Sequence, residues 1–257
     1  MQIEIHRDGL CLRGLLEVPD KETYDMAILL HGFTGNCGYL PEKILHQLAQ
    51  RLLAQGIGVI RMDFNGHGNS DGGFCNMSVL SEILDAKAIL DYVRRMDGVQ
   101  KIYLAGHSQG GVVAGMLAGY YPEYINGLLL MAAASTLKTD AQKGTIMGTN
   151  YDPRHVPDMV QFGMNALDGF YFRSAQSLPI YEVSSLYQGP VCIIQGDADM
   201  IVDKAAAEEY RKIYPNCEFH MIKGANHNFD GPQREELLET EHGDEMKKRM
   251  EHYVRER

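Results

Sequence analysis

The residues best suited to chemistry form the pentapeptide Gly106-His107-Ser108-Gln109-Gly110. A G-x-S-x-G pentapeptide between a strand and a helix places its serine on a strained turn, with the hydroxyl exposed above the sheet. Here an apolar run, KIYLAGHS, leads into a stretch of small residues, GGVVAGMLAGYYP, that is suited to a helix. An ordinary strand-to-helix turn would also fit the pentapeptide alone, but this context favours Ser108 as a nucleophile.

A serine hydroxyl is a weak nucleophile unless a base accepts its proton. With a serine at such a turn, an acid and then a histidine are expected later in the chain, each in a loop that follows a strand. His227 lies in the loop GANH, directly after the last expected strand, so we predict it as the base. The other histidines after Ser108 fall in a strand, in a long insertion or in the charged C-terminal segment: His155, His220, His242 and His252.

The acid is expected in the loop after VCIIQG (191–196), which offers Asp197, Asp199 and Asp203. Asp199 is placed where the loop can turn back toward His227. Asp197 lies close to the end of the strand, where a carboxylate often only stabilises a turn. We therefore predict Asp199 as the residue that orients the base.

Acyl transfer also needs N–H donors for the oxyanion that develops. The N–H of Gln109 follows the nucleophile at the start of a helix, where the helix dipole helps. A second N–H is expected from the loop His31-Gly32-Phe33-Thr34-Gly35, and we assign it to Phe33, although a plain glycine-rich turn would give the same pattern.

Composition restricts the class of protein. The chain has 257 residues, 45% hydrophobic residues and a formal charge of -10, which suits a globular protein and disfavours nucleic acid as a partner. Five scattered cysteines without a C-x-x-C pair suggest neither a disulfide framework nor a zinc site, so we expect no metal and no cofactor. Without an apolar span or a signal peptide, we expect a cytoplasmic protein that binds no membrane. The sequence leaves a homodimer open.

Short apolar runs alternate with amphipathic stretches, which predicts one α/β domain over 1–257. The pattern indicates a mostly parallel eight-stranded sheet flanked by helices. The runs expected to form strands are QIEIH, CLRGLLEV, MAILLHG (26–32), GVIRMDF (58–64), KIYLAGHS (101–108), GLLLMAA (127–133), VCIIQG and EFHMI (218–222). Helices are expected at about 41–55, 78–96 and 234–257 and directly after Ser108.

After the sixth strand, about fifty residues (135–185) interrupt the alternation. Connections of this length are usually functional, so we predict a small lid, with two crossover helices and an irregular loop as the alternative. The insertion carries aromatic residues that could enclose a planar ring or could form a small core of their own. They are Tyr151, Phe162, Phe170, Tyr171, Phe172 and Tyr181.

The segments HGFTG, DFNGHGNSDGG, GHSQGG, GDADMIVD and GANHNF resemble the successive motifs of α/β-hydrolase esterases, and in particular bacterial cinnamoyl (feruloyl) esterases. This resemblance implies an α/β-hydrolase fold and hydrolysis of ferulate, caffeate and p-coumarate esters. It implies a triad of Ser108, His227 and Asp199, and an oxyanion hole of the Phe33 and Gln109 N–H groups. It further implies that Asp140 and Tyr171 bind the phenolic end of the substrate.

The expected partner is therefore a small ester, and we expect a serine carboxylesterase that works through an acyl-enzyme. A short-chain acylglycerol lipase or a general carboxylesterase would carry the same motifs. Epoxide hydrolases and dehalogenases are disfavoured because they use an aspartate where this chain has Ser108. Oligopeptidases are disfavoured because they usually contain a large extra domain, for which a chain of this length has no room. A ligand-binding protein on the same fold would not need all three triad residues in order.

Overall fold

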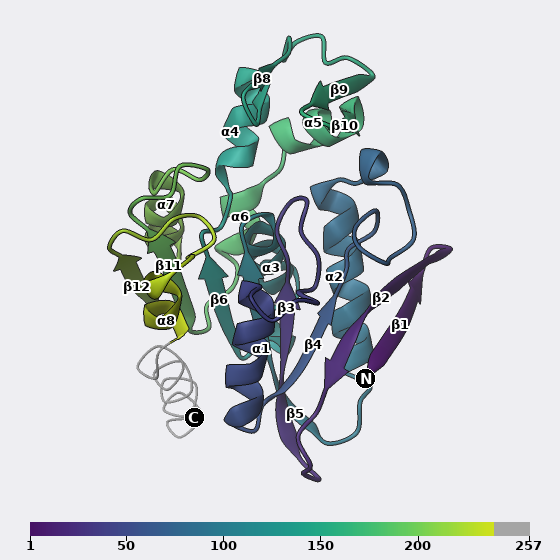
Figure 1. The fold of residues 1–257 in the computed structure, drawn as a ribbon, viewed down its shortest axis with the longest axis vertical. Helices are drawn as coiled ribbons and strands as arrows, with labels where there is room; N and C mark the ends of the chain where they lie inside the picture. The colour runs from purple at the N-terminus through teal and green to yellow at the C-terminus, as the bar shows by residue number, and fades with distance from the viewer. Residues whose placement is uncertain (239–257) are drawn as a thin grey trace.

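A computed structural model describes residues 1–238. Its main sheet has eight strands in the order β1-β2-β4-β3-β5-β6-β11-β12 (Figure 1). In this sheet β2 runs antiparallel to both of its neighbours, β1 and β4, and all other neighbouring strands pair in parallel. The predicted α/β-hydrolase fold is confirmed. The strands are β1 (Gln2–Arg7), β2 (Leu10–Glu17), β3 (Tyr24–Leu30), β4 (Gly58–Met62), β5 (Val99–His107), β6 (Gly127–Met131), β11 (Val191–Gly196) and β12 (Cys217–Ile222).

The central strands are apolar on both faces because helices cover both sides of the sheet. Along β3, Met26 and Ile28 face one hydrophobic core while Ala27 and Leu29 face the other. Helices α2, α3 and α7 pack on the first face, and α1 and α8 pack on the second. The helices of these two layers are α1 (Ile44–Ala54), α2 (Val79–Val93), α3 (Gln109–Tyr120), α7 (Ala205–Ile213) and α8 (Pro232–Leu238), with 3-10 turns η1 (Phe74–Asn76) and η2 (Pro122–Tyr124).

The predicted insertion separates β6 from β11, and it consists of short helices and hairpins. It contains helices α4 (Thr136–Lys143), α5 (Gly169–Gln176) and α6 (Ile180–Ser184), and two hairpins, β7 (Thr145–Ile146) with β8 (Thr149–Asn150) and β9 (Met159–Phe162) with β10 (Asn165–Asp168). Helix α6 packs against α3 as a crossover helix does, whereas α4, α5 and the hairpins stand beyond the end of the sheet, at the top of Figure 1.

Several expected boundaries differ from the structure; the strands expected at 58–64 and 127–133, for example, end at Met62 and Met131. The strand expected at 26–32 ends at Leu30, so that His31 and Gly32 begin the following loop. The C-terminal helix is described as Pro232–Leu238, and the rest of the predicted helix, with His242 and His252, lies outside the described residues. Within residues 1–238, none of the helices is long and apolar enough to cross a bilayer.

Candidate active site

Ser108 stands at the turn between β5 and α3 with backbone angles of φ 56° and ψ -123°. A residue with a side chain rarely adopts a positive φ, so the surrounding contacts must hold this conformation. The N–H of Ser108 donates to the Met131 carbonyl oxygen at 2.9 Å, and its own carbonyl oxygen accepts from Gly111 and Ala134. A Cβ atom at Gly106 would collide with the carbonyl of Gly110, which explains why the pentapeptide has glycine there.

The structure brings the three predicted triad side chains into one hydrogen-bonded chain. His227 Nε2 lies 2.9 Å from Ser108 Oγ, and His227 Nδ1 lies 2.8 Å from Asp199 Oδ2. Because a carboxylate accepts, Nδ1 carries the ring proton and Nε2 is left free to accept the serine proton. The arrangement can therefore generate a serine nucleophile.

Asp199 is fixed by donors other than the histidine. Its Oδ1 accepts from the N–H groups of Ile201 and Val202 at 2.8 and 2.9 Å, and Gln195 Nε2 donates to Oδ2 at 3.0 Å. Burial alone would raise the pKa of Asp199, but the bonds from His227 and the two N–H groups together lower it. Asp199 is thus held as a carboxylate.

Asp197 has a different position. Its Oδ1 accepts from the N–H of Gly224 at 2.6 Å, which joins the loop after β11 to the loop that carries His227. Asp203 instead accepts from the N–H of Ala205, the first residue of α7, at 2.9 Å. Of the three aspartates considered from the sequence, Asp199 is the one with a hydrogen bond to the His227 ring.

Both residues predicted to supply the oxyanion donors, Phe33 and Gln109, line the same cavity as Ser108. Gln109 is the first residue of α3, so its N–H has no acceptor within the helix. In the loop that carries Phe33, a Cβ at Gly32 would come within 2.8 Å of the Ser108 Cβ, so glycine is needed for the close approach of this loop. The Phe33 ring packs against Phe74 and Tyr171 at centroid distances of 5.5 and 5.9 Å.

His31 stabilises the loop that carries Phe33. Its Nε2 accepts from the N–H of Phe64 at 3.0 Å, so Nδ1 carries the proton and donates to the Gly32 carbonyl oxygen at 2.9 Å. Burial and the neighbouring His67 lower the pKa of His31 to about 4, which keeps the ring neutral in this arrangement.

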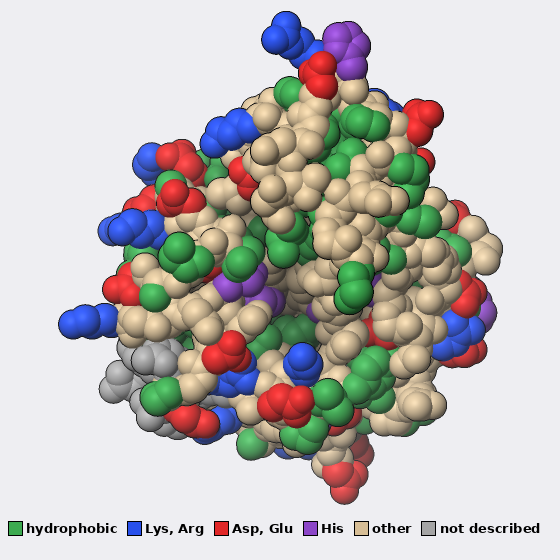
Figure 2. All heavy atoms as spheres, turned by 45° about the horizontal axis from the view of Figure 1, so that its top comes forward, with side chains coloured by type: hydrophobic (Ala, Val, Ile, Leu, Met, Phe, Trp, Pro, Cys, Tyr) green, Lys and Arg blue, Asp and Glu red, His purple; other side chains and the backbone are tan. Residues whose placement is uncertain are grey.

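Two cavities of about 470 Å³ each meet at Ser108. The first lies under the insertion and is mainly apolar, with walls that include Leu137, Ile146 and Phe172. The second is lined by His227 and by polar residues of two loops, among them Asn36 and Asn228. Figure 2 shows this face hollowed near its centre, with histidine side chains beside the hollow.

The predicted substrate-binding residues Asp140 and Tyr171 both line the first cavity. Asp140 comes from α4 and is partly buried, and this burial raises the pKa of its carboxyl group. Tyr171 comes from α5, and its hydroxyl donates to Gln109 Oε1 at 2.8 Å. The proton of the tyrosine is therefore already engaged within the protein, and only its oxygen remains as an acceptor toward the cavity.

The other aromatic residues of the insertion were expected either to enclose a planar ring or to form a small core, and the structure shows some in each position. Phe172 lines the first cavity, while Tyr151 packs on it at a centroid distance of 4.7 Å. Phe162 is buried against Phe33, and Phe170 is 51% exposed. The insertion thus has its own small core, and part of that core forms the wall of the cavity.

Three buried side chains around the site were not anticipated from the sequence as participants. Gln195 supports Asp199, His107 contacts the backbone of His227, and Glu82 accepts from the Gln109 side chain. A signal was present for Glu82, because it falls on the buried face of α2 beside Ile83 and Ala86, where a charged residue is unusual.

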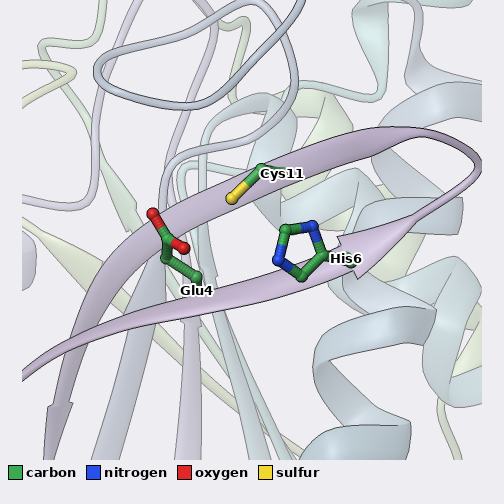
Figure 3. Close-up of side chains that lie close together, drawn as sticks. All are labelled: Glu4, His6 and Cys11. Atoms are coloured by element: carbon green, nitrogen blue, oxygen red, sulfur yellow. The ribbon is translucent and has the colours of Figure 1, made fainter.

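A group of potential metal ligands lies elsewhere, on the β1–β2 hairpin. The ligand atoms of Glu4, His6 and Cys11 lie within 4.8 Å of one another (Figure 3). The Arg13 guanidinium is 3.0 Å from Glu4 Oε1, so a cation already occupies this carboxylate. Burial raises the pKa of Cys11, which disfavours the thiolate that a metal requires.

The fold and the geometry around Ser108 define a serine hydrolase of the α/β-hydrolase class. A family model described as "Serine aminopeptidase, S33" matches residues 22–167, which is more than half of the chain. The chain belongs to this family.

Comparison with individual proteins gives three similarities. A protein from Butyrivibrio proteoclasticus, solved with ferulic acid bound, superposes with a TM-score of 0.90 at 30% identity, covering 95% of this chain and 98% of the other. Monoacylglycerol lipase of Mycolicibacterium smegmatis is 23% identical over 86% of this chain and 88% of its own. Monoglyceride lipase of Rattus norvegicus is 26% identical over 87% and 82%, respectively.

Proposed function

We propose that this protein is a carboxylic ester hydrolase that works through an acyl-enzyme, with hydroxycinnamate esters as its substrates. The observation that carries the mechanism is the chain of hydrogen bonds from Ser108 through His227 to Asp199. Ser108 Oγ attacks the ester carbonyl carbon while His227 Nε2 takes its proton. The N–H groups of Phe33 and Gln109 stabilise the oxyanion.

The tetrahedral intermediate collapses when the bond to the alcohol oxygen breaks and His227 gives its proton to that oxygen. A water molecule then attacks the acyl-enzyme, again with His227 as the base, and releases the acid and Ser108. The alcohol must therefore leave beside His227. His227 lines the second cavity but is not among the residues that line the first, which assigns the alcohol to the second cavity and the acyl group to the first.

The first cavity suits a planar aromatic acyl group. Its apolar wall includes Phe172 and Leu137, and the carboxyl group of Asp140 provides a hydrogen-bond partner for a phenolic hydroxyl. In a caffeate ester, which has two phenolic hydroxyls, the Tyr171 oxygen can accept from the second one. Further support comes from the likeness to the Butyrivibrio protein that binds ferulic acid.

A monoacylglycerol lipase is the second candidate, because two relatives carry that activity in their names and the first cavity is mainly apolar. A binding protein without activity is the candidate from another class. Initial rates on methyl ferulate, methyl caffeate, p-nitrophenyl butyrate and a monoacylglycerol separate the three. A preference for the aliphatic esters would favour the lipase, and the absence of turnover on all four would favour the binding protein.

The variant Asp140→Ala tests the substrate class at residue level. Loss of a hydrogen bond to a charged group costs about 1.5–3 kcal/mol, so kcat/KM for methyl ferulate should fall by about ten- to a hundredfold. The rate on p-nitrophenyl butyrate should hardly change. Asp152→Ala is the matched control, since Asp152 lies in the same insertion and pairs with the exposed His155. Equal losses on both esters would remove the argument for hydroxycinnamates.

A further inference from the structure

Three buried polar side chains from three different helices form a second hydrogen-bonded chain beside Ser108. The Tyr171 hydroxyl in α5 donates to Gln109 Oε1 in α3 at 2.8 Å. Gln109 Nε2 in turn donates to Glu82 Oε2 in α2, also at 2.8 Å. These residues are 6%, 2% and 1% exposed, respectively, so water does not compete for the bonds. Both ends of the Gln109 amide are therefore fixed by the protein.

The surroundings of Glu82 favour its protonated form. In the described part of the chain, none of the ion pairs includes Glu82, and Glu82 Oε1 has no hydrogen-bond partner. The nearby Asp85 is a like charge, and its oxygens are already bound by Arg7 and Asn65. Burial, with a smaller contribution from Asp85, raises the pKa of Glu82 well above its ordinary value. A neutral acid still offers its carbonyl oxygen to Gln109.

We propose that Glu82, as a neutral acid, and Tyr171 are positioning residues for the oxyanion hole. They hold the Gln109 side chain and, through its Cα, fix the direction of the Gln109 N–H. This constraint matters because Gln109 follows Ser108, whose strained φ of 56° persists only while its neighbours are held in place. The inference rests on the oxyanion hole proposed above. Because Tyr171 lies in α5, it also implies that a high kcat requires α5 of the insertion to be correctly placed.

The first test compares Glu82→Leu with Glu82→Gln on p-nitrophenyl butyrate, a substrate without a phenol. Leucine fills the space but accepts no hydrogen bond, so kcat should fall by about tenfold while KM stays nearly constant. Glutamine reproduces a neutral acid and should restore most of the activity. Glu208→Leu, at a partly exposed position on α7, is the control for a glutamate-to-leucine change away from the site. Wild-type kcat in Glu82→Leu, or an equal loss in Glu82→Gln, would overturn the proposal.

The second test separates positioning from general damage. An alkylboronic acid adds to Ser108 Oγ and places an oxygen in the oxyanion hole, whereas butyrate binds as a ground-state product. In Glu82→Leu the inhibition constant of the boronic acid should rise by about as much as kcat/KM falls, about tenfold, while that of butyrate should not change. If the boronic acid inhibits wild type and variant equally, the positioning role is wrong and the hydrolase mechanism stands. Failure to inhibit the wild type would overturn both.

If Glu82→Leu does not fold, Tyr171→Phe provides the same test, because Tyr171 is the other end of the hydrogen-bonded series Tyr171–Gln109–Glu82. The change removes one hydroxyl and little volume, and it leaves the Glu82–Gln109 bond in place. On p-nitrophenyl butyrate we expect kcat to fall by about threefold, with weaker boronic acid binding to the same extent. Unchanged kinetics in a folded Tyr171→Phe would overturn the proposal.

Discussion

His107 Nε2 lies 2.9 Å from the backbone carbonyl oxygen of His227, so a side chain adjacent to the nucleophile holds the loop that carries the base. A carbonyl can only accept, so Nε2 must carry the proton of a neutral ring. Burial and the nearby His227 lower the pKa of His107 to about 4, which keeps this donor in place at neutral pH.

Replacing His107 should therefore slow catalysis, because the loop that carries His227 loses one of its contacts. His107→Phe keeps a ring of similar size but loses the donor, and we expect kcat on p-nitrophenyl butyrate to fall by about three- to tenfold. His155→Phe, at an exposed position, is the control. Unaltered kcat in a folded His107→Phe would mean that other contacts suffice to place His227.

Ser108→Ala should leave a folded protein with very little esterase activity. Without the nucleophile, only binding and the oxyanion hole remain, and in serine proteases these contribute roughly 10³–10⁴ over the uncatalysed rate. A fluorophosphonate probe should label the wild type and not the variant. Appreciable turnover or labelling in Ser108→Ala would place the nucleophile elsewhere.

Asp199→Asn and Asp197→Asn should differ sharply in rate. Asparagine at position 199 can donate to His227 and so favours the wrong tautomer, with a loss of about 10⁴ in kcat, as for the same change in a serine protease triad. The change at Asp197 would only weaken the bond from the Gly224 N–H, so a small loss of stability is expected. Steady-state kinetics and thermal unfolding of both variants make the comparison, and a reversed order of rates would exchange the two roles.

The pH dependence of stability should report the neutral state of His107. Its pKa is about 4 in the folded chain and 6.5 ordinarily, so between these values the unfolded chain binds a proton that the folded chain does not. The contribution of His107 to the free energy of unfolding is therefore fully present above pH 6.5 and is lost as the pH falls toward 4. Glu82 acts in the opposite direction, so the informative quantity is the difference between variants. The free energy of unfolding of wild type and His107→Phe can be measured by urea unfolding at several pH values. Near pH 5 it should rise with pH less steeply in the variant than in wild type, by up to about 1.4 kcal/mol per pH unit. Parallel slopes would contradict the lowered pKa.

Local sequence was enough to name the residues whose side chains meet at the site. The strand before Ser108, the loop position of His227 and the spacing of Asp199 are all properties of short segments. A parallel sheet brings the ends of its strands to one edge, so these segments could be placed together without knowledge of the packing. The same reasoning located the strands along the chain and the position of the insertion.

Contacts between helices were beyond that reasoning. The bond from Tyr171 to Gln109 joins residues 62 positions apart in the chain, and it depends on how α5 settles over α3. For this reason the sequence could assign Tyr171 only to the substrate, whereas the structure shows its proton engaged with the protein. The hairpins of the insertion were also missed, because strands as short as two residues, such as Thr145–Ile146, leave no periodic pattern.

The two cavities meet at a shared boundary formed by Phe33, Ser108, Met147 and Ile201. Apart from this boundary, the walls of the first come largely from the insertion, and those of the second from loops of the main sheet. If each cavity binds one half of the ester, different segments of the chain determine the preference for the acid and the preference for the alcohol, and these segments can change independently in evolution. A lineage could then acquire new acids by altering the insertion, while the range of alcohols it accepts stays as it was.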